Sequence, residues 1–311
     1  MRAVLIENPV AHKVTEARRR VVERALEATF KLERVSTERR GHAADIAREA
    51  VRSGAEAVIT LGGDGTVNEA VNGLMTAGAG SDVCLGVLPG GGTNVLARVL
   101  GYPNDLVDAT AHLIELVESD STRRLRLARL QGQGTDGPFD RVFTFGAGLV
   151  LDAETVRRVE ESGWRPRLGD GAFVIHGFRS FFALRREGEP ALHIQTPGGP
   201  VEAWWAVISK TNPFTYFGKR GLKVAPLARQ DGGLDVTAGR TAKVLRTLRW
   251  LQQVLSTGRH TRHKDVLYLH DQPRVTITAT RPVTLQADGE HLGQVTRVEA
   301  EALPHTLRVW A

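Results

Sequence analysis

The pattern of apolar and polar positions changes its period near residue 122. Before that point, continuous apolar runs of strand length alternate with segments whose apolar residues recur every three or four positions, the spacing of a helix that faces a core. Buried strands that alternate with helices are typical of a parallel, doubly wound α/β sheet. The expected strands are residues 3–7, 32–36, 55–61 and 82–89, and the expected helices lie within residues 13–30, 42–54, 67–75, 90–101 and 104–119.

The rest of the chain has short runs in which apolar and polar residues alternate, separated by Gly, Pro and Asp. This pattern is typical of an antiparallel β-sandwich. Helical spacing interrupts it within residues 151–186 and again within 241–258. We therefore expect two domains, an α/β domain of residues 1–122 and a β-sandwich of residues 123–311 with helical insertions.

A glycine-rich turn follows the third expected strand, in the stretch "VITLGGDGTVNEAVNGL". The residues after the turn have apolar positions at helical spacing, and Thr66 with Glu69 has the spacing of a capping box that would start this helix. Gly62, Gly63 and Gly65 therefore lie between the carboxyl end of a parallel strand and the amino end of a helix. Backbone N–H groups and the helix dipole can bind an anion at such a turn.

A second glycine-rich turn, "GVLPGGGT" (residues 86–93), follows the fourth expected strand. It has the spacing of a Walker A loop, but Gly92 stands where that loop has lysine, and the first turn lacks the third glycine of the dinucleotide fingerprint. A phosphate loop without lysine needs another positive charge, and Mg²⁺ held by Asp64 is the simplest source. Two such turns in one small sheet, each with a threonine near the helix start, indicate a site for nucleotide phosphates.

Composition narrows the class of protein. The chain has 311 residues and a formal net charge of +6, but its arginines are scattered among acidic residues, so we do not expect a nucleic-acid partner. No apolar run is long enough to span a bilayer. The apolar stretch in the first residues, "MRAVLIENP", is too short for a signal peptide. The single cysteine, Cys84, lies in an apolar run and is expected to be buried. These features indicate a cytoplasmic protein.

The motifs "GGDGTVNE" and "LPGGGTNVLAR" resemble the catalytic domain of the bacterial diacylglycerol kinases and of their relatives, the sphingosine and ceramide kinases. The resemblance extends nearly from end to end. "IENP", "TERRGHA", "APLARQDGGLDV", "GRHTRHKDVLYLH" and "LQADGEHLG" resemble further family motifs in the family's order, with His42 in the place of an aspartate.

This resemblance implies a NAD-kinase-like α/β domain followed by an antiparallel β-sandwich domain, with ATP and Mg²⁺ as cofactors. It implies Asp288, with Glu290 beside it, as the catalytic base, and the alternative is that Asp64 and Asp288 exchange roles. It also implies a Mg²⁺ loop formed by the carbonyls of Ala228 and Gly233 and the carboxylate of Asp231, for which a plain turn is the alternative. The residues implied for binding ATP are Asn8, Pro9, Thr37, Gly62, Gly63, Asp64, Gly65, Thr66, Asn68, Glu69, Gly92, Thr93 and Asn94.

Three departures from the family pattern affect the expected metal network. Val95 follows Asn94 where the family commonly has a second aspartate, and Gln230 replaces the first aspartate of the metal loop. Val10 and Ala11 replace the small residues that usually follow Asn-Pro.

The expected activity is transfer of the γ-phosphate of ATP to a lipid hydroxyl, most simply that of diacylglycerol. The alternatives are a soluble NAD kinase and a catalytically weak relative that binds nucleotide or lipid. A lipid substrate implies reversible, peripheral association with the inner face of the membrane, assisted by basic residues and by aromatic residues such as Phe173 and Phe178. Homodimerisation is left open, and Asp288-Gly289 also has the sequence of an ordinary hairpin turn.

Overall fold

The computed structural model describes residues 1–11, 14–80, 82–135, 137–150 and 189–311. The chain forms two compact units: Met1–Leu127 together with Pro304–Ala311, and Ala128–Leu303. The boundary that the sequence placed after residue 122 falls in the structure at Leu127. The C-terminal residues return to the first unit because the last strand starts in the second unit and ends in the first.

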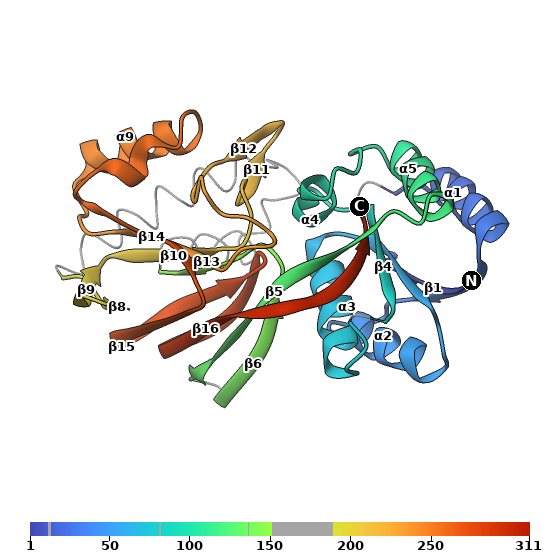
Figure 1. The fold of residues 1–311 in the computed structure, drawn as a ribbon, viewed down its shortest axis with the longest axis horizontal. Helices are drawn as coiled ribbons and strands as arrows, with labels where there is room; N and C mark the ends of the chain where they lie inside the picture. The colour runs from blue at the N-terminus through green and yellow to red at the C-terminus, as the bar shows by residue number, and fades with distance from the viewer. Residues whose placement is uncertain (12–13, 81, 136, 151–188) are drawn as a thin grey trace. The chain divides into compact units, whose positions relative to one another are not determined.

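Unit 1 is a parallel sheet with helices on both faces (Figure 1), as expected for a doubly wound fold. The strand order is β2-β1-β3-β4, and the end of β16 is added beside β4 through the pair Val309 and Leu85. Helices α1 and α5 pack together on one face of the sheet, and α2 packs against α3 on the other. The strands are β1 (Arg2–Glu7), β2 (Lys31–Ser36), β3 (Ala57–Gly62) and β4 (Cys84–Pro89), and the helices are α1 (Glu16–Thr29), α2 (His42–Arg52), α3 (Asp64–Thr76), α4 (Val95–Val99) and α5 (Leu106–Glu118).

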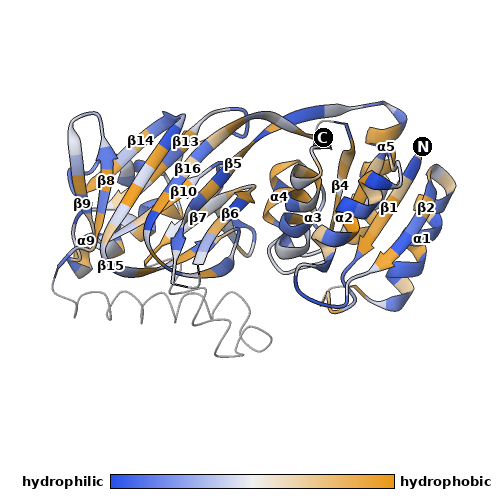
Figure 2. Ribbon diagram, turned by 90° about the horizontal axis from the view of Figure 1, so that it is seen from below, coloured by the Kyte–Doolittle hydropathy of each residue, from blue (hydrophilic) through white to orange (hydrophobic). Residues whose placement is uncertain are grey.

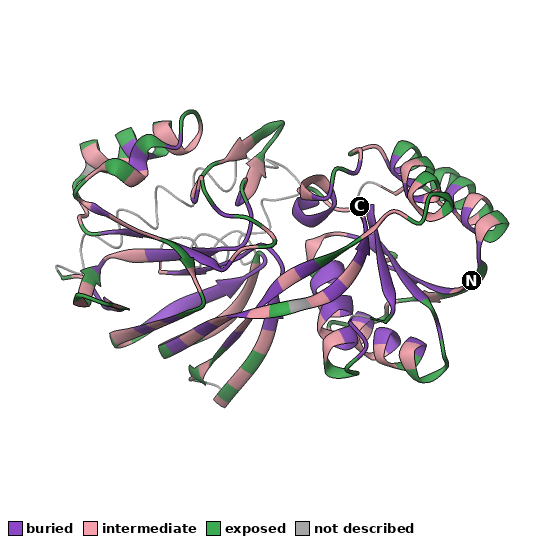
Figure 3. Ribbon diagram, viewed as in Figure 1, coloured by how far each residue is buried: buried purple, intermediate pink, exposed green. Residues whose placement is uncertain are grey.

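The strands of unit 1 differ in apolar character according to how many faces are covered. Every residue of β3 and β4 is buried, whereas β2, at the edge of the sheet, has no buried residue. Figure 2 shows β1 and β4 as largely hydrophobic, and Figure 3 shows exposed residues on the outer faces of α1 and α5. The continuous apolar runs of the sequence therefore mark central strands that are covered by helices on both sides.

The C-terminal residues complete the core of unit 1. The Trp310 side chain is buried and packs edge-on against Phe30, with ring centroids 5.9 Å apart. The hydroxyl of Tyr102 donates to the Trp310 carbonyl at 3.1 Å. Unit 1 thus depends on residues that follow unit 2 in the chain.

Unit 2 is built from antiparallel strands around one apolar core, as the alternating pattern predicted. Its ladder runs β14-β13-β10-β7-β15-β16, with the β8–β9 hairpin on β15 and the β5–β6 hairpin on β16. The elements are β5 (Thr122–Gly134, which begins in unit 1), β6 (Gly137–Phe143), β7 (Gly146–Leu149), β8 (Leu192–Thr196), β9 (Gly199–Ala203), β10 (Trp205–Ser209), β11 (Thr215–Phe217), β12 (Arg220–Leu222), β13 (Leu234–Gly239), α9 (Val244–Val254), η1 (Arg259–Arg262), β14 (Val266–Gln272), β15 (Arg274–Ala287) and β16 (Glu290–Trp310).

Strand β15 bends where it changes partner. Its first half pairs with β8 and its last residues pair with β7, and the register against β16 shifts between Thr278 and Val283. Such irregularities bend a strand and increase its twist. The change of partner places the β8–β9 hairpin and β7 on different parts of one long strand.

Helix α9 lies within the second helical insertion that the sequence predicted, and its Trp250 packs against Trp205 of β10 with ring centroids 6.5 Å apart. The first predicted insertion, residues 151–186, lies outside the described residues, and so do Phe173 and Phe178. Cys84 is buried as expected, and burial raises the pKa of its thiol to about 12. None of the described helices combines the length and the apolar character needed to cross a bilayer.

Candidate functional site

The two glycine-rich turns of unit 1 lie against each other. Gly62 pairs with Pro89 at the ends of β3 and β4, and the N–H of Gly90 donates to the Gly62 carbonyl at 2.8 Å. A Cβ atom on Gly91 would lie 2.6 Å from the Cα of Gly63, closer than such atoms approach in proteins. Glycine is therefore required where the turns touch.

Gly65 has no such packing requirement. Nothing lies within 4 Å of the position that a Cβ atom would take, and the backbone there has no positive φ. Gly65 is the second residue of α3, so the open space lies at the amino end of this helix, where N–H groups have no partner within the helix. The turn thus leaves room for a group that approaches the backbone closely, and the helix dipole favours an anion there.

Helix α3 begins three residues earlier than the sequence suggested, and the predicted capping box is wrong. The helix starts at Asp64, and its N-cap residue, Gly63, has no side chain to form the cap. Thr66 is already helical, and its side chain packs over Gly62, where a Cβ atom would lie 2.6 Å from the threonine Oγ1.

Glu69 instead stabilises the start of helix α2. Its carboxylate accepts hydrogen bonds from the N–H of Gly41 at 2.8 Å and from that of Ala43 at 3.2 Å. Gly41 is the N-cap residue of α2 and has a positive φ of 80°. Glu69 thus ties the turn after Thr37 to α3, and the N–H of Thr37 itself donates to the Glu7 carbonyl at 2.8 Å.

Asn8 joins the first strand to the glycine turn. Its Nδ2 lies 3.2 Å from the Thr66 Oγ1, and its Oδ1 accepts from the N–H of Val10 at 3.1 Å. This second bond turns the chain at Asn8-Pro9 and leaves Val10 exposed. The Asn-Pro motif therefore lies beside the first glycine turn.

Two polar side chains hold the second turn. Asn94 has a left-handed backbone with φ of 52°, and its side chain exchanges hydrogen bonds with the N–H and carbonyl of Gly91, each at 2.9 Å. Asp64 Oδ1 accepts from the N–H of Val95 at 2.6 Å, at the first residue of α4. Asn68 is buried in α3 and bonds to Asn72, while Gly92 is exposed and Thr93 is half-buried.

In unit 2, Asp288 and Gly289 are the two residues of the turn between β15 and β16, and both have positive φ. The Asp288 side chain is buried and accepts four hydrogen bonds, from the N–H and hydroxyl of Thr144 and from the N–H groups of Phe145 and Gly146, over 2.6–3.1 Å. Burial raises the pKa of Asp288, although these donors oppose the shift. Glu290 forms an ion pair with Arg141.

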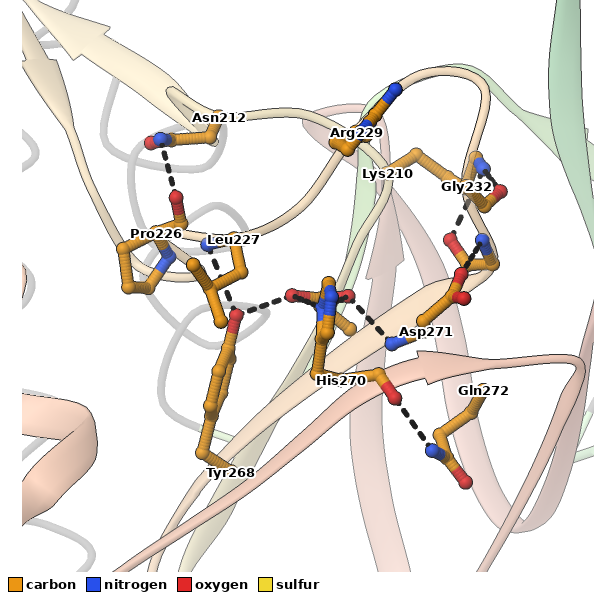
Figure 4. Close-up of polar contacts among 12 residues, drawn as sticks. Lys210, Asn212, Pro226, Leu227, Arg229, Gly232, Tyr268, His270, Asp271 and Gln272 are labelled. Carbon is orange, nitrogen blue, oxygen red and sulfur yellow. Dashed lines mark hydrogen bonds and ion pairs between the residues drawn. The ribbon is translucent and has the colours of Figure 1, made fainter.

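The loop predicted to hold Mg²⁺ contains a lysine ammonium group instead (Figure 4). Lys210 is fully buried, and its Nζ donates to the carbonyls of Gly232 at 2.6 Å and Gly233 at 3.2 Å. The carboxylate of Asp231 is bonded to the guanidinium of Arg229 at 2.8–2.9 Å on the surface. The ammonium group of Lys210 already contacts the Gly233 carbonyl, and the Asp231 carboxylate is already paired with Arg229. Gly233 and Asp231 therefore do not fit a divalent ion.

Next to this loop, Asp235 anchors the neighbouring strand. It is buried and accepts from the N–H of Asp271 at 3.0 Å and from the hydroxyl of Tyr268, and its carboxylate lies 2.9 Å from Nδ1 of His270. Among the residues that the structure describes, no three His, Cys, Asp or Glu side chains gather where they could hold a metal ion.

Sequence reasoning did not identify Lys210 or Thr144. Lys210 follows the apolar run of β10, and a lysine at the end of a buried strand is the signal that could have drawn attention to it. Thr144 carries no comparable signal, because its role depends on Asp288, which lies 144 positions later in the chain.

Two family models match the chain. Residues 2–128 match the diacylglycerol kinase catalytic domain, and residues 147–311 match the YegS C-terminal NAD kinase beta sandwich-like domain. A Staphylococcus aureus protein named diacylglycerol kinase is 27% identical over 300 residues, which cover 94% of this chain and 87% of the relative.

Two solved structures share the fold. A diacylglycerol kinase from Bacillus anthracis superposes with a TM-score of 0.69 at 18% identity, covering 99% of this chain and 96% of that one. An NAD kinase from Archaeoglobus fulgidus, solved in complex with ATP, has a TM-score of 0.53 at 11% identity, covering 100% of this chain and 94% of that one. The expected fold, an α/β domain followed by a β-sandwich, is confirmed.

Proposed function

Because this chain belongs to the diacylglycerol kinase catalytic-domain family, we propose that it is an ATP-dependent lipid kinase that phosphorylates the hydroxyl of diacylglycerol to give phosphatidic acid. The observation that carries the proposal is the pair of glycine turns packed against each other, with open space at Gly65 beside the amino end of α3. A turn of this form fits phosphate oxygens better than it fits an uncharged ligand.

In this proposal the turn residues of unit 1 bind ATP. The N–H groups at the start of α3 would donate to phosphate oxygens, and Asn8 with Thr66 would border the site. Mg²⁺ would arrive with the nucleotide and neutralise charge on the phosphates, and Asp64 is the acidic residue in the first turn of α3. Catalysis of phosphoryl transfer consists mainly of such positioning and charge stabilisation.

Asp288 is the proposed base for the attacking hydroxyl. Burial raises the pKa of Asp288, which makes its carboxylate a stronger proton acceptor than an exposed aspartate. Its oxygens already accept four hydrogen bonds, so one donor has to give way when the proton is taken. Glu290 is paired with Arg141 and is the weaker candidate, and Asp64 is the alternative if Asp288 only holds the turn.

The test is an assay with radiolabelled ATP and a panel of acceptors: diacylglycerol, ceramide, sphingosine, undecaprenol and NAD. Labelled phosphatidic acid as the main product supports the proposal. NADP as the main product would instead identify a soluble NAD kinase. ATP binding without transfer to any acceptor would identify a non-catalytic relative.

A further inference from the structure

The positive charge of the protein is concentrated in one segment of unit 2. Seven of the chain's 41 lysines and arginines lie between Arg240 and Lys264, and none of its 35 acidic residues does. The remainder of the chain therefore carries 34 basic and 35 acidic residues and is close to neutral. The net charge of +6 belongs to the segment that contains helix α9 and η1.

Helix α9 also exposes a row of leucines. Leu245, Leu248 and Leu251 recur every three residues, and their exposed fractions are 82%, 40% and 42%. Arg249 is exposed on the same helix, whereas Trp250 is buried against Trp205, which holds the helix on unit 2. Figure 3 shows α9 as a mixture of exposed and half-buried residues with one small buried part. An amphipathic helix usually turns its apolar row to the core, so leucines that face outward need another reason.

The β11–β12 hairpin extends the same surface. Phe217 is exposed beside Lys219 and Arg220 at the hairpin turn. The chain leaving the hairpin is bonded to the end of α9, because the N–H of Lys223 donates to the Val254 carbonyl at 2.9 Å and its Nζ donates to the Ser256 carbonyl at 2.9 Å. Figure 1 shows the hairpin and α9 along one side of unit 2. In the described part of unit 2, the exposed large apolar side chains are Phe217 of the hairpin, Leu245, Leu248 and Leu251 of α9, and Leu227 of the loop that follows the hairpin.

We propose that α9 and the β11–β12 hairpin form a docking surface for a bilayer that contains anionic lipids. Outward leucines and a phenylalanine would enter the boundary between head groups and acyl chains, and the basic residues would remain among the anionic head groups. Each basic residue near such a surface adds a favourable, salt-dependent contribution to binding. The proposal deepens the proposed function, since it names the surface by which a lipid kinase would reach its substrate.

The charge and the leucine row together argue against the other occupants of such a surface. A second copy of the chain would bring its own seven basic residues against these seven, and within the described residues only Arg246 is paired with an acidic residue, Asp265, just outside the segment. A nucleic acid would use the charge but would leave the leucine row in water. An anionic bilayer matches both features.

The test is co-sedimentation of the whole protein, without ATP, with vesicles of phosphatidylcholine alone or mixed with phosphatidylglycerol. We expect binding to the anionic vesicles, weaker binding as salt rises, and poor binding to the neutral ones. The double variant Leu245→Glu/Leu248→Glu should lower the partition coefficient at least about tenfold, because it replaces inserted apolar groups by charges. Arg249→Glu should lower it less, and only at low salt.

The matched control is Val21→Glu/Arg24→Glu, which changes an exposed valine and an exposed arginine on α1 of unit 1 and should bind vesicles like the wild type. Circular dichroism and melting curves check that each variant is folded. Equal binding of the leucine variant and the wild type would overturn the proposal, and so would a leucine-dependent dimer seen by light scattering without vesicle binding.

Assays with a short-chain diacylglycerol that is soluble as a monomer separate this proposal from the proposed function. The leucine variant should phosphorylate the soluble substrate at the wild-type rate but lose activity on substrate embedded in vesicles. If the wild type binds vesicles but phosphorylates neither substrate, the docking surface stands and the kinase proposal fails. If the variant keeps full activity on embedded substrate, the docking surface fails alone.

Discussion

The carboxylate of Asp64 accepts a hydrogen bond from the backbone N–H of Val95, with 2.6 Å between Oδ1 and the nitrogen. In the family pattern described above, a second aspartate commonly occupies the position of Val95. In this chain Asp64 keeps its carboxylate, which holds the first residue of α4. Asp64 therefore combines a structural role, the start of α4, with its proposed role near the phosphates.

Two substitutions of Asp64 separate these roles. Asp64→Ala removes the acceptor for Val95 and should lower the free energy of unfolding by about 0.5–2 kcal/mol, the usual cost of losing such a cap. Asp64→Asn keeps an oxygen acceptor but removes the charge, so it should be nearly as stable as the wild type. Urea denaturation measures the first effect, and kcat for ATP should fall in both variants. A fully active Asp64→Asn variant would show that the charge is not used.

Gly65 and Gly91 should respond oppositely to alanine. Gly65→Ala enters open space in a helix and should leave stability unchanged or raise it by up to about 1 kcal/mol. Gly91→Ala places a Cβ 2.6 Å from the Gly63 Cα and should destabilise the fold. Thermal melting compares the two.

Gly65→Asp should remain folded but lose ATP turnover, because a carboxylate would occupy the open space and repel phosphates. Gly65→Asn, which has nearly the same size without the charge, is its control. Wild-type kinetics in Gly65→Asp would mean that phosphates do not bind at this turn.

The pH at which the reaction rate falls on the acidic side should depend on the pKa of Asp288. A base works only when ionised, and burial raises the pKa of Asp288 above its ordinary value of 3.8, so the rate should fall at a higher pH than an exposed aspartate would give. Asp288→Asn should lose about 10²–10⁴-fold in kcat. A loss of kcat below tenfold would indicate that Asp64 or Glu290, rather than Asp288, is the base.

The same raised pKa has the opposite consequence for stability. Ionising Asp288 is harder in the folded than in the unfolded chain, so its contribution to the free energy of unfolding should fall as the pH rises from 3.8 through the raised pKa. Urea denaturation of the wild type and of Asp288→Asn across this range should show the wild type losing stability relative to the variant as pH increases.

Because Lys210 occupies the predicted metal loop, we expect the second unit to be stable without a divalent ion. Lys210→Met leaves the carbonyls of Gly232 and Gly233 without their buried donor and should lower the free energy of unfolding by roughly 1–3 kcal/mol. The control Lys219→Met changes an exposed lysine and should be neutral. Without nucleotide, EDTA and millimolar Mg²⁺ should leave the melting temperature of the wild type unchanged. A melting temperature that falls in EDTA would show a bound structural metal.

The sequence predicted features that depend on neighbouring residues, and missed those that depend on residues far away. The strands of unit 1 and helix α9 follow from local periodicity, and the two glycine turns follow from the order of strand, glycines and helix. Glu69 has the spacing of a capping box for α3, but its carboxylate binds the N–H groups at the start of α2. The N-cap residue of α3 is Gly63 instead. The lysine that fills the predicted metal loop lies more than 20 positions before it, and no local pattern connects the two.

The return of β16 to unit 1 has a consequence for biosynthesis. Proteins usually fold from the N-terminal domain onward as the chain is made. Here Val309 and Trp310 are translated after all of unit 2, so β4 keeps an unpaired edge while the ribosome is still making the second unit. Unpaired strand edges promote aggregation. The nascent chain should therefore depend on chaperones until its final strand is available, and a nonsense mutation before Pro304 should damage the domain encoded first.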